Sequence, residues 1–383
     1  MTATAFTGAR IFDGTGWHAA GAALVVRDGA VEQVGDAAGG ERVELGGGMI
    51  VPGFVDLQVN GGGGVLLNDD PGVAAIRRIC AAHARFGTTA LLPTLITDTP
   101  AATRAAIEAG VAAASADVPG FLGLHLEGPH LSIARKGAHD PALIRPMTDA
   151  DLLVLCDAAA RLPVLLVTVA AESVRPDQVA ALSKAGAIVS IGHSDAGLAE
   201  VQALADAGAS MATHLFNAMS QIGNREPGLA GAALSDGRLS AGLIADGIHV
   251  HPATMGLALR GKQGPGRIFL VSDAMAVAGT DLTEFSLNGR TIHRAAGALR
   301  LADGTLAGAD LTMIEAVRFV HRELGIDLGD ALRMAALYPA LAIGGAGGRG
   351  RLTAGSRADF VHLDDDLQIR GTWISGVAAR DAA

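Results

Sequence analysis

The middle of the chain carries eight short hydrophobic runs, each continuous rather than alternating with polar residues. Strands buried on both faces of a parallel sheet have this pattern. The predicted strands are Phe54–Gln58, Thr88–Pro93, Phe121–Leu126, Val164–Val169, Ala187–Ile191, Ser210–His214, Leu239–Ile244 and Arg267–Val271. Helix-like segments rich in Ala, Leu and Arg separate most of them, including Val73–Phe86, Ala101–Ala114 and Leu198–Ala207, and Asp310–Leu324 follows the eighth. Eight β/α units favour a TIM (β/α)8 barrel over a doubly wound sheet.

The two ends of the chain have a different residue pattern from the middle. Short strands near the start are interrupted by Asp-Gly and Gly-Gly turns, as in "VVRDGAVEQVG", and "ADFVHLDDDLQIRGTWISG" near the end is similar. Such dipeptides favour hairpins. We therefore predict an α/β protein in which residues 1–50 and 350–383 form one small β-sandwich domain, and residues 51–349 form the barrel.

Composition narrows the possible partners. Half of the residues are hydrophobic, and the net charge is −10 without a basic run, which argues against nucleic acid but not against a small anion. No apolar stretch is long enough to predict a membrane span, and the N-terminus does not resemble a signal peptide. Two cysteines in helix-like contexts fit a reducing compartment, so we expect a cytoplasmic protein.

Polar residues gather where the predicted strands end. At or just past the strand ends stand Gln58 and Asn60 for the first strand, His125 and Glu127 for the third, His193 for the fifth, His214 and Asn217 for the sixth, Asp246 and His249 for the seventh, and Asp273 for the eighth. One such residue alone is more often a helix cap or a packing residue. In a closed barrel these ends meet at one mouth. Two imidazoles and a carboxylate suit a divalent metal, and a further aspartate could act as acid and base.

Eight motifs in a fixed order then identify a family. They are "PGFVDLQVNG", "HLEGPHLS…KGAHDP", "IGHSDA", "THLFNAM", "NREPGLAGA", "IADGIHV", "VSDAMAVAG" and "DGTLAGADLTM". Together they resemble the amidohydrolase superfamily and, within it, the N-acetylglucosamine-6-phosphate deacetylases, over nearly the whole chain. The resemblance implies hydrolysis of the N-acetyl group of N-acetyl-D-glucosamine 6-phosphate to D-glucosamine 6-phosphate and acetate.

The resemblance also implies a catalytic apparatus. In this family one divalent metal ion per subunit, often zinc, is held by residues that match Glu127, His193 and His214. Iron, cobalt or manganese could occupy the same ligands. Asp273 matches the catalytic aspartate, which takes a proton from the metal-activated water and returns it to the leaving amine. His139, in the long loop after the third strand, matches a histidine that stabilises the oxyanion.

Further matches concern the sugar phosphate. Arg225 and His249 match phosphate contacts that lie near a dimer interface in relatives, so the resemblance implies a homodimer. Asn217 and Ala218 match a segment that contacts the ligand. A loop that closes over the sugar matches Leu306, Ala307 and Gly308.

The pair Gln58 and Asn60 stands where many amidohydrolases carry a His-x-His pair that holds a second metal. Amides are poor ligands for zinc beside imidazole and carboxylate, so we expect a single metal ion. The amides would then be free to hydrogen-bond water or substrate. We expect the glycines that follow, from Gly61 to Gly64, to keep the mouth open.

Other functions stay open at this stage. The galactosamine epimer of the substrate differs at one hydroxyl, and no residue distinguishes the two sugars. A cyclic-amide or N-acyl-amino-acid hydrolase on the same barrel should lack the phosphate pair. A non-catalytic sugar-phosphate-binding protein should have lost a metal ligand or the aspartate, whereas Glu127, His193, His214 and Asp273 are all present.

Overall fold

The computed structural model describes residues 3–36 and 40–379. Its centre is an eight-stranded parallel sheet in the order β16-β15-β14-β13-β12-β11-β10-β7. The strands are β7 (Phe54–Val59), β10 (Thr88–Ile96), β11 (Leu124–Glu127), β12 (Leu165–Val169), β13 (Ile188–Ile191), β14 (Met211–Ala212), β15 (Ser240–Leu243) and β16 (Ile268–Leu270). Each overlaps one predicted strand, so the barrel prediction is confirmed.

The first and last strands of this sheet meet just beyond the end of β16. The backbone N–H of Asp273 donates to the carbonyl of Gln58 at 3.0 Å, and that of Asn60 donates to Ala274 at 2.8 Å. The buried carboxylate of Asp56 on β7 also accepts hydrogen bonds from the backbone and the hydroxyl of Ser272. These bonds bring the first and last strands together and place Asp273 beside Asn60.

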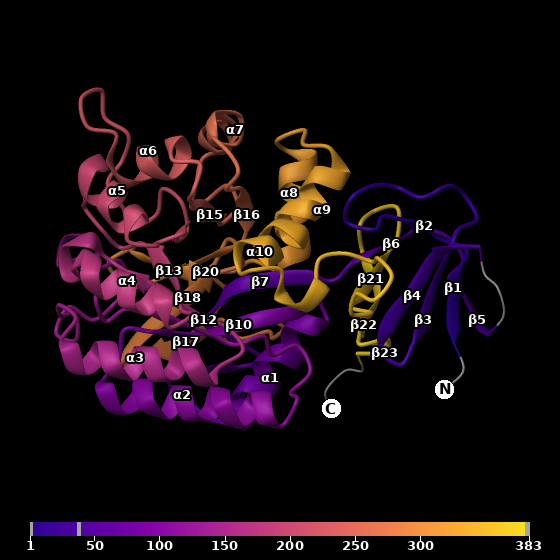
Figure 1. The fold of residues 1–383 in the computed structure, drawn as a ribbon, viewed down its shortest axis with the longest axis horizontal. Coiled ribbons are helices and arrows are strands. Elements are labelled where there is room, and N and C mark those ends of the chain that lie inside the picture. Colours follow the sequence, from indigo (N-terminus) through magenta and orange to yellow (C-terminus); the bar gives the residue numbers. More distant parts are fainter. Residues whose placement is uncertain (1–2, 37–39, 380–383) are drawn as a thin grey trace.

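Helices cover the outside of the barrel (Figure 1). Their bounds are α1 (Val73–Ala84), α2 (Pro100–Ser115), α3 (Asp149–Arg161), α4 (Pro176–Lys184), α5 (Leu198–Asp206), α6 (Gly228–Ser235), α7 (Pro252–Gly261), α8 (Met313–Arg322), α9 (Leu328–Ala335) and α10 (Leu337–Ala342). In α8, buried Met313, Val317 and Val320 recur at helical spacing and form its inner face. None of the helices in residues 3–36 and 40–379 is long and apolar enough to cross a membrane.

Two sheets lie beside the barrel, one built from strands near the start of the chain and the other from strands of both ends (Figure 1). One sheet has the order β4-β3-β1-β5, and the other has the order β2-β6-β21-β22-β23. The strands are β1 (Thr4–Thr7), β2 (Arg10–Ile11), β3 (Ala23–Arg27), β4 (Ala30–Gly35), β5 (Glu41–Glu44), β6 (Met49–Pro52), β21 (Phe360–Leu363), β22 (Ile369–Ile374) and β23 (Val377–Ala378). Phe6 and Phe360, from opposite ends of the chain, pack edge to face in a common core with their ring centroids 4.8 Å apart.

An antiparallel sheet that the sequence analysis did not predict lies between β16 and α8. Its strands are β17 (Glu284–Leu287), β18 (Arg290–Ala295), β19 (Ala298–Arg300) and β20 (Leu306–Ala309). Leu287, Ile292 and Leu299 pack in one cluster with Leu66 and Met275. The insertion therefore shares a hydrophobic cluster with residues outside it, and its last strand, β20, reaches the barrel mouth through the bridge between Ala309 and Ala274.

Candidate active site

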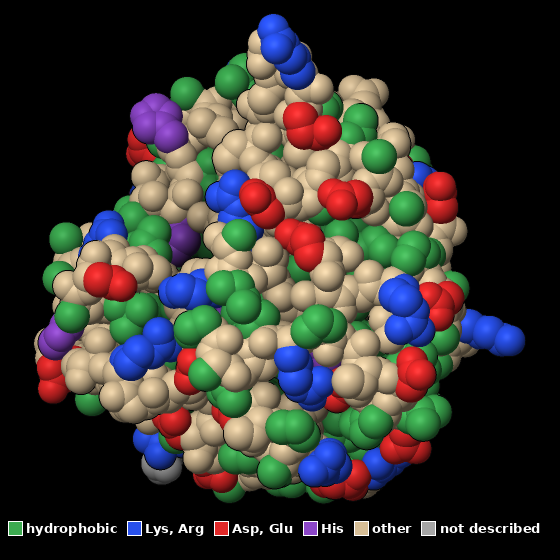
Figure 2. All heavy atoms as spheres, turned by 90° about the vertical axis from the view of Figure 1, so that its left-hand side faces the viewer, with side chains coloured by type: hydrophobic (Ala, Val, Ile, Leu, Met, Phe, Trp, Pro, Cys, Tyr) green, Lys and Arg blue, Asp and Glu red, His purple; other side chains and the backbone are tan. Residues whose placement is uncertain are grey.

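A cavity of about 330 Å³ lies at the carboxyl ends of the barrel strands. Figure 2, which views the molecule from the side away from the terminal sheets, shows a hollow with histidine atoms visible at depth. The structure brings most of the predicted site residues to this cavity: Asn60, Glu127, His139, His193, His214, Asn217, Ala218, His249, Asp273, Leu306, Ala307 and Gly308. Gln58 lies buried beneath it, and Arg225 is exposed and does not belong to its lining.

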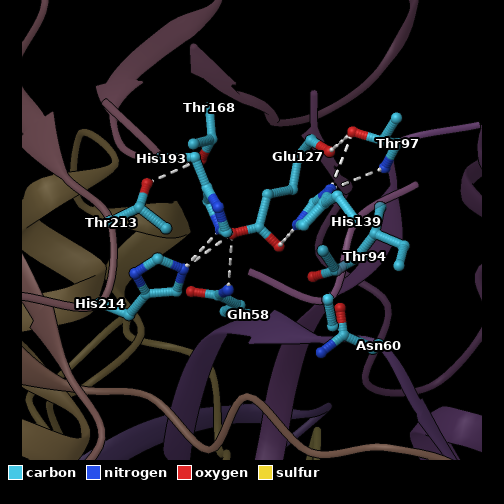
Figure 3. Close-up of polar contacts among 12 residues, drawn as sticks. Gln58, Asn60, Thr94, Thr97, Glu127, His139, Thr168, His193, Thr213 and His214 are labelled. Carbon is cyan, nitrogen blue, oxygen red and sulfur yellow. Dashed lines mark hydrogen bonds and ion pairs between the residues drawn. The ribbon is translucent and has the colours of Figure 1, made fainter. Parts of the chain in front are cut away.

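Three of these side chains converge on one point (Figure 3). The Glu127 carboxylate, at the end of β11, has its Oε1 3.3 Å from His193 Nε2 and 3.1 Å from His214 Nε2. The two Nε2 atoms are 3.0 Å apart. All three residues are buried. One carboxylate and two imidazoles with donor atoms this close fit a divalent metal ion.

A fourth side chain lies close enough to compete for such an ion. The ligand atoms of Glu127, His139 and His193 all lie within 4.8 Å of one another. The Nε2 of His139 is 3.9 Å from Glu127 Oε2. Proximity alone therefore leaves His139 and His214 both available as the third ligand.

A contact on the far side of the His193 ring fixes the orientation of the ring. Its Nδ1 lies 2.8 Å from the backbone carbonyl of Arg135, which can only accept a hydrogen bond. The proton of the neutral ring is therefore on Nδ1, and the lone pair of Nε2 faces Glu127. Metal-bound histidines commonly show this arrangement.

Charges in the cluster depend strongly on one another. Burial alone would raise the pKa of Glu127, but His193 and His214 outweigh it and hold that pKa well below its usual range. Burial also opposes protonation of His214, yet the hydrogen bond and charge of Glu127 raise its pKa. Burial and the charge of Glu127 raise the pKa of Asp273 to about 6. The site therefore keeps Glu127 as an anionic carboxylate beside the Asp273 carboxyl group, which can take up and release a proton near neutral pH.

The two amides of the first strand bind these carboxyl groups. Gln58 Nε2 donates to Glu127 Oε1 at 3.1 Å, and Asn60 Nδ2 donates to Asp273 Oδ1 at 2.7 Å. The side chains occupy the positions expected from the sequence, but their partners in the structure are the two carboxylates. Gln58 and Asn60 thus hold the carboxyl groups of Glu127 and Asp273 in place.

Three key residues have a left-handed backbone, which is uncommon outside glycine. The φ angles are 48° for His193, 28° for His214 and 49° for Asp273. Each such conformation costs about 1–3 kcal/mol and is found mainly where the surrounding structure enforces it, often at functional sites. The strain aims the side chains of three different strand ends into one cavity.

The glycines after Asn60 do not hold the mouth open, contrary to our expectation. Gly61 and Gly62 are buried, and they form the short strand β8 (Gly61–Gly62) paired with β9 (Val65–Leu66). A Cβ on Gly61 would lie 2.3 Å from the carbonyl of Val65, and one on Gly62 would lie 2.9 Å from His83 Nε2. The glycines are required by close packing of this hairpin against α1 and the segment after β16.

His249 is the predicted phosphate contact that lies inside the cavity. Its Nδ1 is 2.6 Å from Asp246 Oδ2, and Asp246 Oδ1 accepts the backbone N–H groups of Ile248 and His249 at 2.8 Å. Both side chains are almost fully buried. Asp246 therefore orients the ring and leaves its Nε2 as the free nitrogen.

The sequence analysis missed two residues that touch the site histidines. Arg135 lines the cavity and orients His193 through its carbonyl. Thr97 directly follows β10 and contacts His139 Nδ1 through both its backbone N–H and its hydroxyl. A survey of strand ends that included the second strand would have found Thr97. The contact of the Arg135 carbonyl, a main-chain group, leaves no signal in the sequence.

Comparison with known proteins agrees with this geometry. The family model described as "Amidohydrolase family" matches residues 49–379. The chain belongs to the amidohydrolase family. The predicted resemblance is thereby confirmed, and so is the expectation of an amide-hydrolysing enzyme. This family is metal-dependent, and the buried glutamate–histidine cluster could hold the metal.

Individual relatives cover most of the chain. It is 44% identical over 329 residues to the N-acetylgalactosamine-6-phosphate deacetylase of Shewanella sp. (strain ANA-3), covering 86% of this chain and 82% of the relative. It is 36% identical over 352 residues to the human N-acetylglucosamine-6-phosphate deacetylase, covering 88% and 84%. The crystal structure of N-acetylglucosamine-6-phosphate deacetylase from Pasteurella multocida superimposes with a TM-score of 0.94 at 34% identity, covering 98% of this chain and 99% of that one.

Proposed function

We propose that this chain removes the acetyl group from an N-acetylhexosamine 6-phosphate and releases acetate and the amino sugar phosphate. The observation that carries the proposal is the convergence of Glu127, His193, His214 and Asp273 on one cavity. N-acetyl-D-glucosamine 6-phosphate is the first candidate substrate, since several similar relatives are named N-acetylglucosamine-6-phosphate deacetylase. The galactosamine epimer is the second candidate and is favoured by the 44% identity to the Shewanella enzyme.

Glu127, His193 and His214 are the proposed ligands of one divalent metal ion, with zinc first and iron, cobalt or manganese as alternatives. Bound there, the ion would supply a water of lowered pKa and would polarise the amide carbonyl. The protein's own groups do the rest. Gln58 keeps Glu127 in place through its 3.1 Å hydrogen bond, and Arg135 keeps the ring of His193 turned toward the same point.

Asp273 is the proposed proton carrier. As the water oxygen bonds to the amide carbon, Asp273 takes the water's proton. As the C–N bond breaks, it passes that proton to the leaving nitrogen, which departs as a neutral amine. Asn60 occupies one oxygen of the carboxyl group and leaves the other for the proton. A pKa of about 6 suits a group that must both accept and return a proton near neutral pH.

The phosphate end of the substrate is proposed to bind at His249, beside Asn217 and Ala218 in the cavity lining. Arg225 is exposed on its own subunit, outside the cavity lining. We infer that it serves the site of a second copy in a homodimer. An arginine is suited to phosphate by its planar fork of donors.

The test measures acetate release from N-acetylglucosamine, N-acetylgalactosamine and their 6-phosphates, using wild-type protein loaded with zinc and an Asp273→Asn control. We expect release from a phosphorylated sugar and at least a 100-fold loss in the control, in line with removal of a general acid–base group. Release without any preference for phosphate would leave the hydrolase class and remove the substrate assignment. No release from any of the four sugars would overturn the proposal.

A further inference from the structure

Thr97 presents two donors to a single nitrogen of His139. It is buried directly after β10, with its backbone N–H 3.3 Å and its Oγ 2.8 Å from His139 Nδ1 (Figure 3). A backbone N–H can only donate, so the Nδ1 that faces it must offer its lone pair. The hydroxyl lies closer to Nδ1 than to its other acceptor, the carbonyl of Glu127 at 3.5 Å. The neutral ring of His139 therefore carries its proton on Nε2.

His193 has the opposite arrangement although its ring centre is only 4.4 Å from that of His139. Its Nδ1 faces the carbonyl of Arg135 and holds the proton, which leaves a lone pair on Nε2. A metal ion needs that lone pair, whereas a developing oxyanion needs an N–H donor. The two histidines are thus prepared for different tasks, and His214 is left as the third ligand.

We propose that Thr97 is a positioning residue that fixes His139 with its proton on Nε2, keeps it off the metal ion, and presents it as a neutral N–H donor to the amide oxygen. This inference rests on the proposed deacetylase function. The Nε2 atom is on the cavity side of the ring, 3.9 Å from Glu127 Oε2. Burial and the neighbouring His193 lower the pKa of His139 well below its usual range, which agrees with a neutral ring.

The packing around Thr97 is built to keep this contact. A Cβ on Gly128 would lie 2.2 Å from the Thr97 hydroxyl oxygen, and Gly128 has a φ of +90°. Glycine at this position, directly after Glu127, lets the loop pass close enough for Thr97 to reach His139. The same short segment therefore carries a metal ligand and makes room for the residue that orients the donor.

The experiment compares zinc-loaded wild type with Thr97→Val, which keeps the shape and loses the hydroxyl, and Thr97→Ser, which keeps the hydroxyl. Because the backbone N–H remains in both, we expect a partial loss for valine, about tenfold in kcat with KM within about twofold. Serine should restore kcat to within about threefold of wild type. Zinc content should be the same in all three, since His139 is not a ligand.

A second measurement, NMR of 15N-labelled histidine, shows which ring nitrogen of His139 carries the proton. In protein labelled with 15N-histidine, the His139 signals, identified by their loss in His139→Gln, should show an unprotonated Nδ1 and a protonated Nε2 with zinc bound. In Thr97→Val this preference should weaken. A protonated Nδ1 in the wild type, or wild-type kcat in Thr97→Val, would overturn the inference. If wild-type protein released no acetate, the proposed function would fail, while the 15N result would still decide the proton's position.

Discussion

The carboxyl group of Asp56 offers a test of the barrel closure. Asp56 is completely buried on β7, and it accepts hydrogen bonds from Ser272 Oγ at 2.5 Å and from the backbone N–H groups of Gln58 and Ser272 at 3.2 Å. Burial raises its pKa from 3.8 to about 7. Asp56→Asn mimics the protonated form, because its amide can donate to Ser272 Oγ and still accept from the backbone groups.

The sign of the pH dependence follows from the raised pKa. Between pH 4 and pH 7 the folded protein keeps a proton on Asp56 that the unfolded chain has lost. The contribution of this group to stability is therefore complete below pH 4, and it is lost as the pH rises to 7. A shift from 3.8 to about 7 corresponds to a loss of about 4 kcal/mol. Asp56→Asn does not titrate and should escape this loss.

The assay is urea unfolding of both proteins in chelator, followed by circular dichroism between pH 4.5 and pH 8. Chelator removes the pH dependence of metal binding from both curves. The free energy of unfolding of Asp56→Asn minus that of wild type should grow with pH by most of the about 4 kcal/mol. A difference between the two proteins that stays constant across this range would refute a titrating carboxyl group at the closure.

Three further changes test other parts of the site. Glu127→Gln should reduce bound metal, measured by elemental analysis, and lower kcat/KM at least 100-fold, since it removes the anionic ligand. Asp246→Asn removes a charge-assisted hydrogen bond to His249. It should leave kcat within about threefold of wild type but lower the preference for the 6-phosphate about tenfold. This preference is measured as the ratio of kcat/KM for the phosphorylated sugar to kcat/KM for the unphosphorylated sugar. Gly62→Ala should lower the melting temperature by several degrees, about 1–3 kcal/mol, because its Cβ meets His83 at 2.9 Å. Gly16→Ala is a matched control without the clash, since neither Gly16 nor Gly62 has a positive φ and a Cβ added at Gly16 meets no atom within 4 Å.

The barrel and the residues at its mouth could be predicted because their signals are local. Each buried strand is a continuous apolar run that can be recognised in the sequence. Because the barrel places the carboxyl ends of all its strands on one face, the polar residues at those ends are expected to form one site. Glu127, His193 and Asp273 were found in this way, and the structure brings all three to one cavity.

The inserted sheet could not be predicted for a physical reason. Strands β17 and β18 are half exposed and carry polar residues, so they resemble a connecting loop. They pack in one cluster with Leu66, which lies more than 200 positions earlier in the chain. The prediction that the glycines after Asn60 keep the mouth open was wrong for a related reason. Four consecutive glycines allow both an open loop and a tightly packed hairpin, and only the neighbours Val65 and His83 decide between them.

The sequence does not assign separate roles to the histidines of the cavity. His139 and His193 are the same residue type, are both buried, and lie on one cavity wall, so neither composition nor proximity assigns their roles. The difference is made by main-chain groups on the far side of each ring, a carbonyl from Arg135 and an N–H from Thr97. These groups come from 58 and 42 positions away along the chain. For His139 and His193, the group that faces the remote nitrogen therefore separates the proposed hydrogen-bond donor from the proposed metal ligand, and it does so before any metal is bound.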